Sequence, residues 1–122
     1  MKRVMILAAL ALVAGPALAA PPVVGKTDKG EALVDAAGMS LYTFDKDGPG
    51  QSACEGECAE YWPPALAAAG DKAGPGFSAI ARPDGAQQWA YKDKPLYTWT
   101  KDSAPGETTG DGVKGVWHLA RP

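Results

Sequence analysis

The side chains of this chain best suited to redox or metal chemistry are two cysteines, Cys54 and Cys58, four positions apart. Two such thiols in an exported protein most simply form a disulfide, because export leads to oxidising compartments. In the chain-entropy model a loop this short stabilises the fold by only about 2 kcal/mol. We therefore predict a Cys54–Cys58 disulfide that mainly stiffens its own loop.

A metal site is the alternative for the same two residues. Cys-x-x-x-Cys lets two thiolates converge on one soft ion, and copper(I) or zinc prefers such ligands. His118 or Met39 would complete the set of ligands. Covalent haem attachment is not expected, because the chain has no Cys-x-x-Cys-His motif.

A motif of two aromatic residues and an acid, Tyr-x-aromatic-x-x-Asp, occurs twice. Its members are Tyr42, Phe44 and Asp47, then Tyr97, Trp99 and Asp102. In a strand the two rings of each copy point to one face, which permits two interpretations. One is an aromatic binding platform with the acids at its rim. The other, which we favour, is a core built from these rings together with Trp62 and Trp117, in which each Asp accepts backbone N–H bonds in the turn that follows.

The motif belongs to a longer internal repeat. A shift of 55 residues places Leu41–Asp47 on Leu96–Asp102 without a gap, Gly30 on Gly85, and Trp62 on Trp117. Such self-similarity is the signature of a duplicated structural unit. We predict an all-β fold: one small domain, residues 20–122, made of two β-hairpin-plus-loop repeats with approximate internal twofold symmetry. Repeat one covers residues 29–64, a linker 65–83, and repeat two 84–119.

Short extended runs separated by Gly and Pro are the elements that would hold these residues. Strands are expected at 31–35, 39–44, 77–81, 86–91, 96–99 and 115–120. The first two should form a hairpin across the turn at 36–38, as should 86–91 and 96–99 across 92–94. Residues 20–28 read as a lead-in. Residues 57–62 read as a single helical turn, stopped by the two prolines after it.

The first 19 residues have the form of an export signal. Lys2 and Arg3 precede an apolar run at 4–13, and we expect cleavage after Ala19 rather than Ala20, which Pro21 follows. No cysteine near this site offers a lipid attachment point, so we expect no stable membrane anchor. The predicted location is the periplasm or the extracellular medium.

Charge argues against two classes of partner. Without Lys2 and Arg3, the 12 basic residues fall to ten, against 14 acidic ones. An acidic domain without basic clusters is unsuited to nucleic acid or to anionic membranes.

Several motifs in order resemble one family. They are Leu-Tyr-Thr-Phe-Asp-Lys-Asp, Cys-x-x-x-Cys-Ala-x-x-Trp-Pro-Pro, Pro-Leu-Tyr-x-Trp and Gly-Asp-Gly-Val-x-Gly-Val-Trp-His. Together they are similar to the bacterial secreted-repeat family, predicted lipoproteins that carry the Tyr-x-(Phe/Trp/Tyr)-x-x-Asp motif. The resemblance implies export and a duplicated fold, and it implies no reaction.

Enzyme signatures are scarce in this sequence. No nucleophile motif surrounds any serine, and no glycine pattern typical of phosphate binding precedes a helix. We therefore predict a non-catalytic envelope module that binds or interacts with an unknown envelope partner. The alternative is a periplasmic protein that handles copper or another metal through Cys54 and Cys58.

Overall fold

The computed structural model describes residues 20–68, 71–72 and 74–122, and its regular elements are mainly short strands. The strands are β1 (Val23–Thr27), β2 (Gly30–Val34), β3 (Tyr42–Phe44), β4 (Leu66–Ala67), β5 (Phe77–Ala81), β6 (Gln87–Tyr91), β7 (Lys94–Pro95) and β8 (Trp117–Leu119). The helical elements are α1 (Glu57–Tyr61) and a 3-10 turn, η2 (Val113–Gly115). The predicted all-β class is confirmed, and α1 ends just before Pro63, as expected. In the described part of the chain, no helix is long and apolar enough to cross a membrane. The predicted signal at 1–19 lies outside the described residues.

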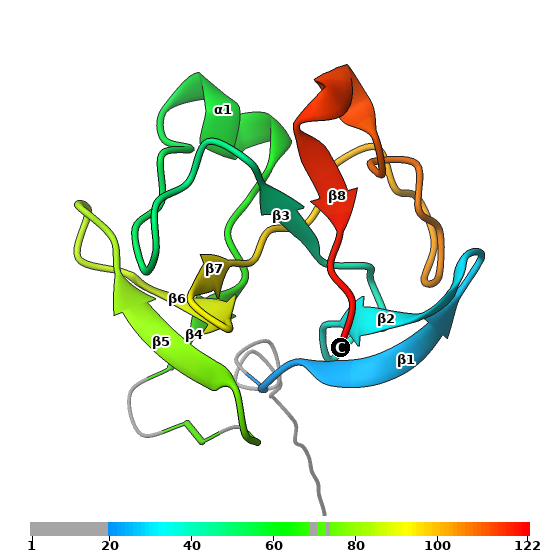
Figure 1. The fold of residues 1–122 in the computed structure, drawn as a ribbon, viewed down its shortest axis with the longest axis horizontal. Coiled ribbons are helices and arrows are strands. Elements are labelled where there is room, and N and C mark those ends of the chain that lie inside the picture. The colour runs from blue at the N-terminus through cyan, green and yellow to red at the C-terminus, as the bar shows by residue number, and fades with distance from the viewer. Residues whose placement is uncertain (1–19, 69–70, 73) are drawn as a thin grey trace, which may run out of the picture.

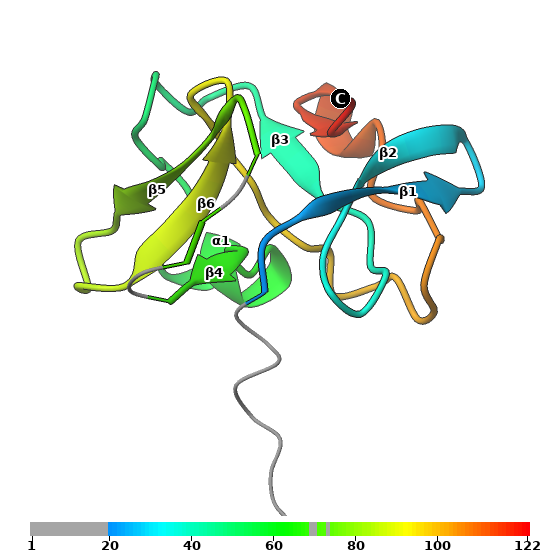
Figure 2. The same cartoon turned by 90° about the horizontal axis from the view of Figure 1, so that it is seen from below.

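The approximate twofold symmetry is visible in the arrangement of the elements. The antiparallel hairpins β1–β2 and β5–β6 lie on opposite sides of the molecule, and α1 faces η2 across its upper edge (Figure 1). The second hairpin is part of a larger sheet, because β6 also pairs with β4 and β7. Figure 2 shows the two hairpins from below as separate lobes.

The predicted hairpin of the first copy is present only in part. The turn at 36–38 exists, with a bridge between Val34 and Ser40, but the main partner of β2 is β1, over five residue pairs. The segment 20–28, expected to be an irregular lead-in, therefore contains a strand. Pro22 does not prevent this, because a proline just before a strand deprives the ladder of no N–H group. β3 in turn pairs with β8, from the far end of the chain.

The two copies are interlocked through their backbones. Tyr42 N–H donates to the Tyr97 carbonyl (2.8 Å) and Tyr97 N–H to the Tyr42 carbonyl (3.0 Å), so the motif strands meet each other at the twofold axis. Tyr42 also pairs with Leu119, and Tyr97 with Pro64, positions related by the same 55-residue shift. Each motif strand is thus paired by the returning segment of the other copy.

Two hydrophobic clusters, each drawn from both copies, fill the interior. One surrounds the motif tyrosines with Trp62, Trp117 and Leu119. The other contains Leu33, Leu41, Ala65, Trp89, Leu96 and Ala120. The equivalent positions Leu41 and Leu96, like Ala65 and Ala120, lie in the same cluster, so the duplicated residues pack together.

Gly110 allows the chain to pass close to the first cluster. A Cβ atom there would lie 2.9 Å from Trp62 Cη2 and 3.0 Å from both Trp99 Cγ and Tyr42 Cζ. We expect Gly110→Ala to lower the free energy of unfolding by about 1–3 kcal/mol, because overpacking forces rings or backbone to move. Urea unfolding would measure the change. The control is Gly74→Ala, where the added methyl group meets nothing within 4 Å. Equal midpoints for the two variants would contradict the packing described here.

Candidate functional site

The tyrosines and aspartates of the repeated motif bond across the copies. Tyr42 Oη donates to Asp102 Oδ2 (2.7 Å), and Tyr97 Oη donates to Asp47 Oδ2 (2.7 Å). Both tyrosines are fully buried. The exchange therefore joins repeat one to repeat two at two equivalent points.

The second oxygen of each aspartate closes the loop that follows it. Asp47 Oδ1 accepts the Ala53 N–H (2.6 Å), and Asp102 Oδ1 accepts the Thr109 N–H (2.9 Å) and hydroxyl (2.6 Å). These are the backbone bonds expected from the sequence. The structure shows in addition that each aspartate accepts a bond from the tyrosine of the opposite copy. The tyrosines and aspartates of the motif therefore belong to the core rather than to an exposed platform.

A buried polar network extends the exchange on one side only. Arg82, with 7% of its surface exposed, donates to Ser52 Oγ (3.1 Å), to Gln88 Oε1 (2.7 Å) and to the Cys54 carbonyl (2.9 Å). Ser52 Oγ lies 2.6 Å from Tyr97 Oη. The network ties the cysteine loop to the tyrosine. The repeat gives no signal for this network, because Thr27 occupies the position equivalent to Arg82, so the sequence does not predict it.

Burial shifts the pKa values of the motif's phenols and of one of its carboxyl groups. It raises the pKa of Tyr42 and of Tyr97 well above the usual 10.0, and the hydrogen bonds to Asp102 and Asp47 raise them further. Burial also raises the pKa of Asp47, against the opposing effect of the N–H of Ala53 and the hydroxyl of Tyr97. Both phenols therefore remain protonated donors across the neutral range.

Four aromatic rings form a continuous stack above the exchange. Phe44 stacks on Trp117 (4.1 Å between centroids), Trp117 on Trp62 (3.8 Å), and Trp62 on Trp99 (3.9 Å). The outer rings are symmetry equivalents, and so are the inner ones. Trp62 and Trp117 are buried, whereas Phe44 and Trp99 are half-buried and pack on the edge of the cluster. The core prediction thus holds for the inner pair and is only partly right for the outer pair.

The stack forms the wall of a groove of about 660 Å³. The half-exposed Tyr61 and the side chain of Cys58 line it from the α1 side, with Val113 and Val116 opposite. Its charged lining residues are Lys46, Lys101, Lys114 and Glu57. Lys46 and Lys101 are the same residue at equivalent positions of the repeat. That identity is the sequence signal that would have marked them as candidate site residues.

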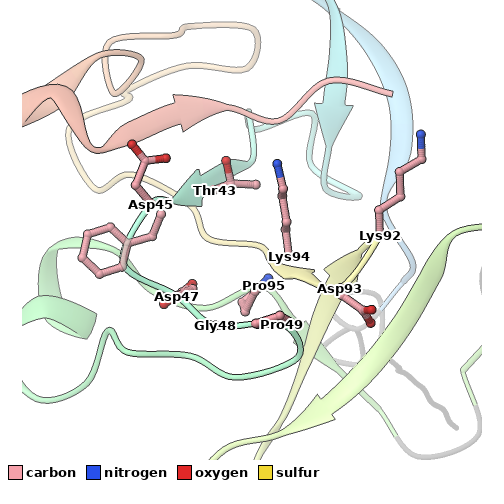
Figure 3. A pocket seen from close by; sticks show the side chains of 10 residues that line it. Thr43, Asp45, Asp47, Gly48, Pro49, Lys92, Asp93, Lys94 and Pro95 are labelled. Atoms are coloured by element: carbon pink, nitrogen blue, oxygen red, sulfur yellow. The ribbon is translucent and has the colours of Figure 1, made fainter.

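A smaller hollow of about 320 Å³ lies between the loop after β3 and the β6–β7 turn (Figure 3). Its lining mixes charges: Asp45, Asp47 and Asp93 with Lys92 and Lys94. In Figure 3 the Lys94 side chain extends alongside Thr43 rather than toward Asp47. Of the four stacked rings only Phe44 lines this hollow, and the groove is the better candidate site.

The predicted disulfide is present between Cys54 and Cys58, with sulfurs 2.07 Å apart. The other suggested metal ligands lie elsewhere. His118 Nε2 is 2.8 Å from Asp45 Oδ2 and lines a different hollow, and Met39 closes the turn that begins at Asp35. Among residues 20–68, 71–72 and 74–122, no group of three or more His, Cys, Asp or Glu side chains is placed to hold a metal ion. Metal binding thus stays an untested prediction.

Comparison with known proteins gives one match. A family model described as a secreted repeat of unknown function matches the chain twice, at residues 23–66 and 78–121. The two ranges differ by the same shift of 55 residues; the first contains β1, and the second contains β5 except for Phe77. No curated protein and no solved structure matches.

The raised pKa of Tyr97 predicts a loss of stability in alkali. Above about pH 10 the unfolded chain loses the phenolic proton that the folded chain retains, so stability falls as pH rises. We expect Tyr97→Phe to unfold more easily at pH 7, by about 1–3 kcal/mol, because Asp47 Oδ2 loses its donor. Between about pH 10 and 11.5 the free energy of unfolding should fall less steeply for Tyr97→Phe than for wild type. The two slopes should differ by up to about 1.4 kcal/mol per pH unit. Urea unfolding across this range measures both slopes, and parallel slopes would contradict the assignment.

Proposed function

The chain belongs to this family of secreted repeats, and on that premise we propose that it is an exported, non-catalytic binding module of the cell envelope. We place it in the periplasm or outside the cell, with the groove beside the ring stack as its binding surface. The partner is a small molecule or a short protruding group of a larger one.

The observation that carries the proposal is that equivalent residues of both copies line one groove. Phe44 and Trp99, Trp62 and Trp117, and Lys46 and Lys101 are pairs under the internal symmetry. The groove's volume of about 660 Å³ lies within the range of about 300–1,000 Å³ that is common for small-molecule sites. The groove exists only where the two copies meet, so the duplication supplies both the scaffold and the site.

The scaffold holds the groove in a fixed shape. The inner rings rest against the buried tyrosines: Tyr42 lies edge-on to Trp62 (5.5 Å) and Tyr97 edge-on to Trp117 (5.2 Å). The disulfide fixes the loop that leads into α1, and α1 carries Tyr61 at its end. A preformed site loses less entropy when it binds, which favours recognition.

The lining chemistry supports binding rather than turnover. Rings and ammonium groups attract and orient a ligand. The buried tyrosines beneath the stack donate their protons to Asp47 and Asp102, so their hydroxyl groups are engaged within the protein.

The tryptophans offer a direct test, because three of the four line the groove and the fourth, Trp89, is buried in the other cluster. NMR spectra of ¹⁵N-labelled protein would follow the four indole N–H signals during a screen of small ring compounds bearing acidic, neutral or basic groups. We expect some compounds to shift the signals of Trp62, Trp99 and Trp117 and to leave Trp89 unchanged.

Tyr61→Ala should weaken the binding of such compounds by roughly fivefold, because an aromatic contact contributes about 1 kcal/mol. Tyr61 is 49% exposed, so its removal should leave the fold intact. The matched control is Leu66→Ala, 51% exposed and outside the groove, which should bind as wild type does. If no compound moves the groove indoles, or if both variants bind equally well, the groove is not the binding surface.

A further inference from the structure

We propose that the groove binds a flat organic anion, with its acid group at the Phe44 end between Lys46 and Lys114. This inference rests on the proposed function of the groove and names the class of ligand. It follows from what the rings expose and from how charge is distributed along the groove.

The inner rings can present only their edges to a ligand. Trp62 is covered on one side by Trp99 (3.9 Å) and on the other by Trp117 (3.8 Å), and Phe44 covers the second face of Trp117 (4.1 Å). An aromatic ring is electron-rich on its faces and electron-poor at its edge. The middle of the groove wall therefore attracts the face of a flat ring or a negative group, and it lacks the open ring face that a cation would prefer.

The Phe44 end of the groove carries two ammonium groups. Asp45 N–H donates to the Val116 carbonyl (2.8 Å), which places Lys46 beside the η2 turn that contains Lys114. Both lysines are exposed, and neither forms an ion pair with another described residue. The acids adjacent to Lys46 are engaged elsewhere: Asp45 with His118 (2.8 Å), and Asp47 with Tyr97 (2.7 Å).

The Trp99 end differs in charge although it is built on the equivalent positions. Thr100 N–H donates to the Tyr61 carbonyl (3.1 Å), so Lys101 lies beside the end of α1. Glu57, the first residue of α1, also lines the groove and shares a helix face with Tyr61, four positions later. The position equivalent to Glu57 is Gly112, and the one equivalent to Lys114 is Ala59. Divergence of the copies has thus made one end cationic and left the other end balanced and aromatic.

These features fix the orientation of the ligand. Its acid group pairs with Lys46 and Lys114, and its flat body extends along the indole edges toward Tyr61. The chain carries a net charge of −2, and the two ammonium groups make this end of the groove locally cationic, which favours an anion.

The test compares two probes of similar shape and opposite charge, 2-naphthalenesulfonate and 2-naphthylmethylammonium. Each is titrated into wild-type protein while the indole N–H signals are followed by NMR. We expect the sulfonate to shift the signals of Trp62, Trp99 and Trp117, and the ammonium compound to bind at least tenfold more weakly.

Three variants locate the acid group. Lys46→Gln and Lys114→Gln should each raise the Kd of the sulfonate fivefold or more, whereas the matched control Lys101→Gln should change it less than twofold. All three side chains are exposed, so the fold should be retained, and unchanged Trp89 signals would verify that. Equal losses in the three variants would overturn the assignment to the Phe44 end. Tighter binding of the ammonium probe would overturn the proposed ligand class and leave the groove as a binding surface. If neither probe nor any compound of the wider screen shifts the groove indoles, the proposed function fails as well.

Discussion

The structure depends on an exchange of hydrogen bonds between two copies of one motif. Each motif tyrosine is buried without access to water, so its hydroxyl needs a partner inside the protein. The aspartate of the opposite copy supplies that partner at both points. Because the same aspartates also close the loops that follow them, the exchange couples the strands at the centre to the loops at the rim.

Duplication and divergence contribute different parts of the molecule. The identical positions build the frame: paired tyrosines, paired aspartates and the inner indoles of the stack. Equivalent residues of both copies also build the groove wall, whereas the diverged positions make its two ends differ, since Tyr61, Glu57 and Lys114 have no chemical equivalent in the other copy. A symmetric frame thus supports an asymmetric surface, which is what recognition of a ligand with two unlike ends requires.

The sequence predicts those features that reside in local patterns or in the repeat. It predicts the all-β class, the short helix before Pro63, the Cys54–Cys58 disulfide and the bonds from Asp47 and Asp102 to the following turns. It does not predict that β3 pairs with β8, because such long-range pairing leaves no local signal. It also does not predict β1, although β1 pairs with its neighbour β2 and takes the place in repeat one that β5 takes in repeat two. The lysines of the groove lie far apart in the sequence, and only the fold places them along one groove. The roles of Arg82 and Ser52 cannot be predicted from the sequence for a related reason. The two residues occur in one copy only, and they act through contacts distant in sequence.

A double-mutant cycle on Tyr42 tests the exchange most directly. Urea unfolding would be measured for Tyr42→Phe, Asp102→Asn, Asp47→Asn and the two double variants that contain Tyr42→Phe. Contacting residues couple by about 0.5–3 kcal/mol, whereas independent ones are nearly additive. The account predicts coupling of this size between Tyr42 and Asp102, and a clearly smaller value between Tyr42 and Asp47 of its own copy. The reverse order would show that each motif bonds within its own repeat, and would contradict the account.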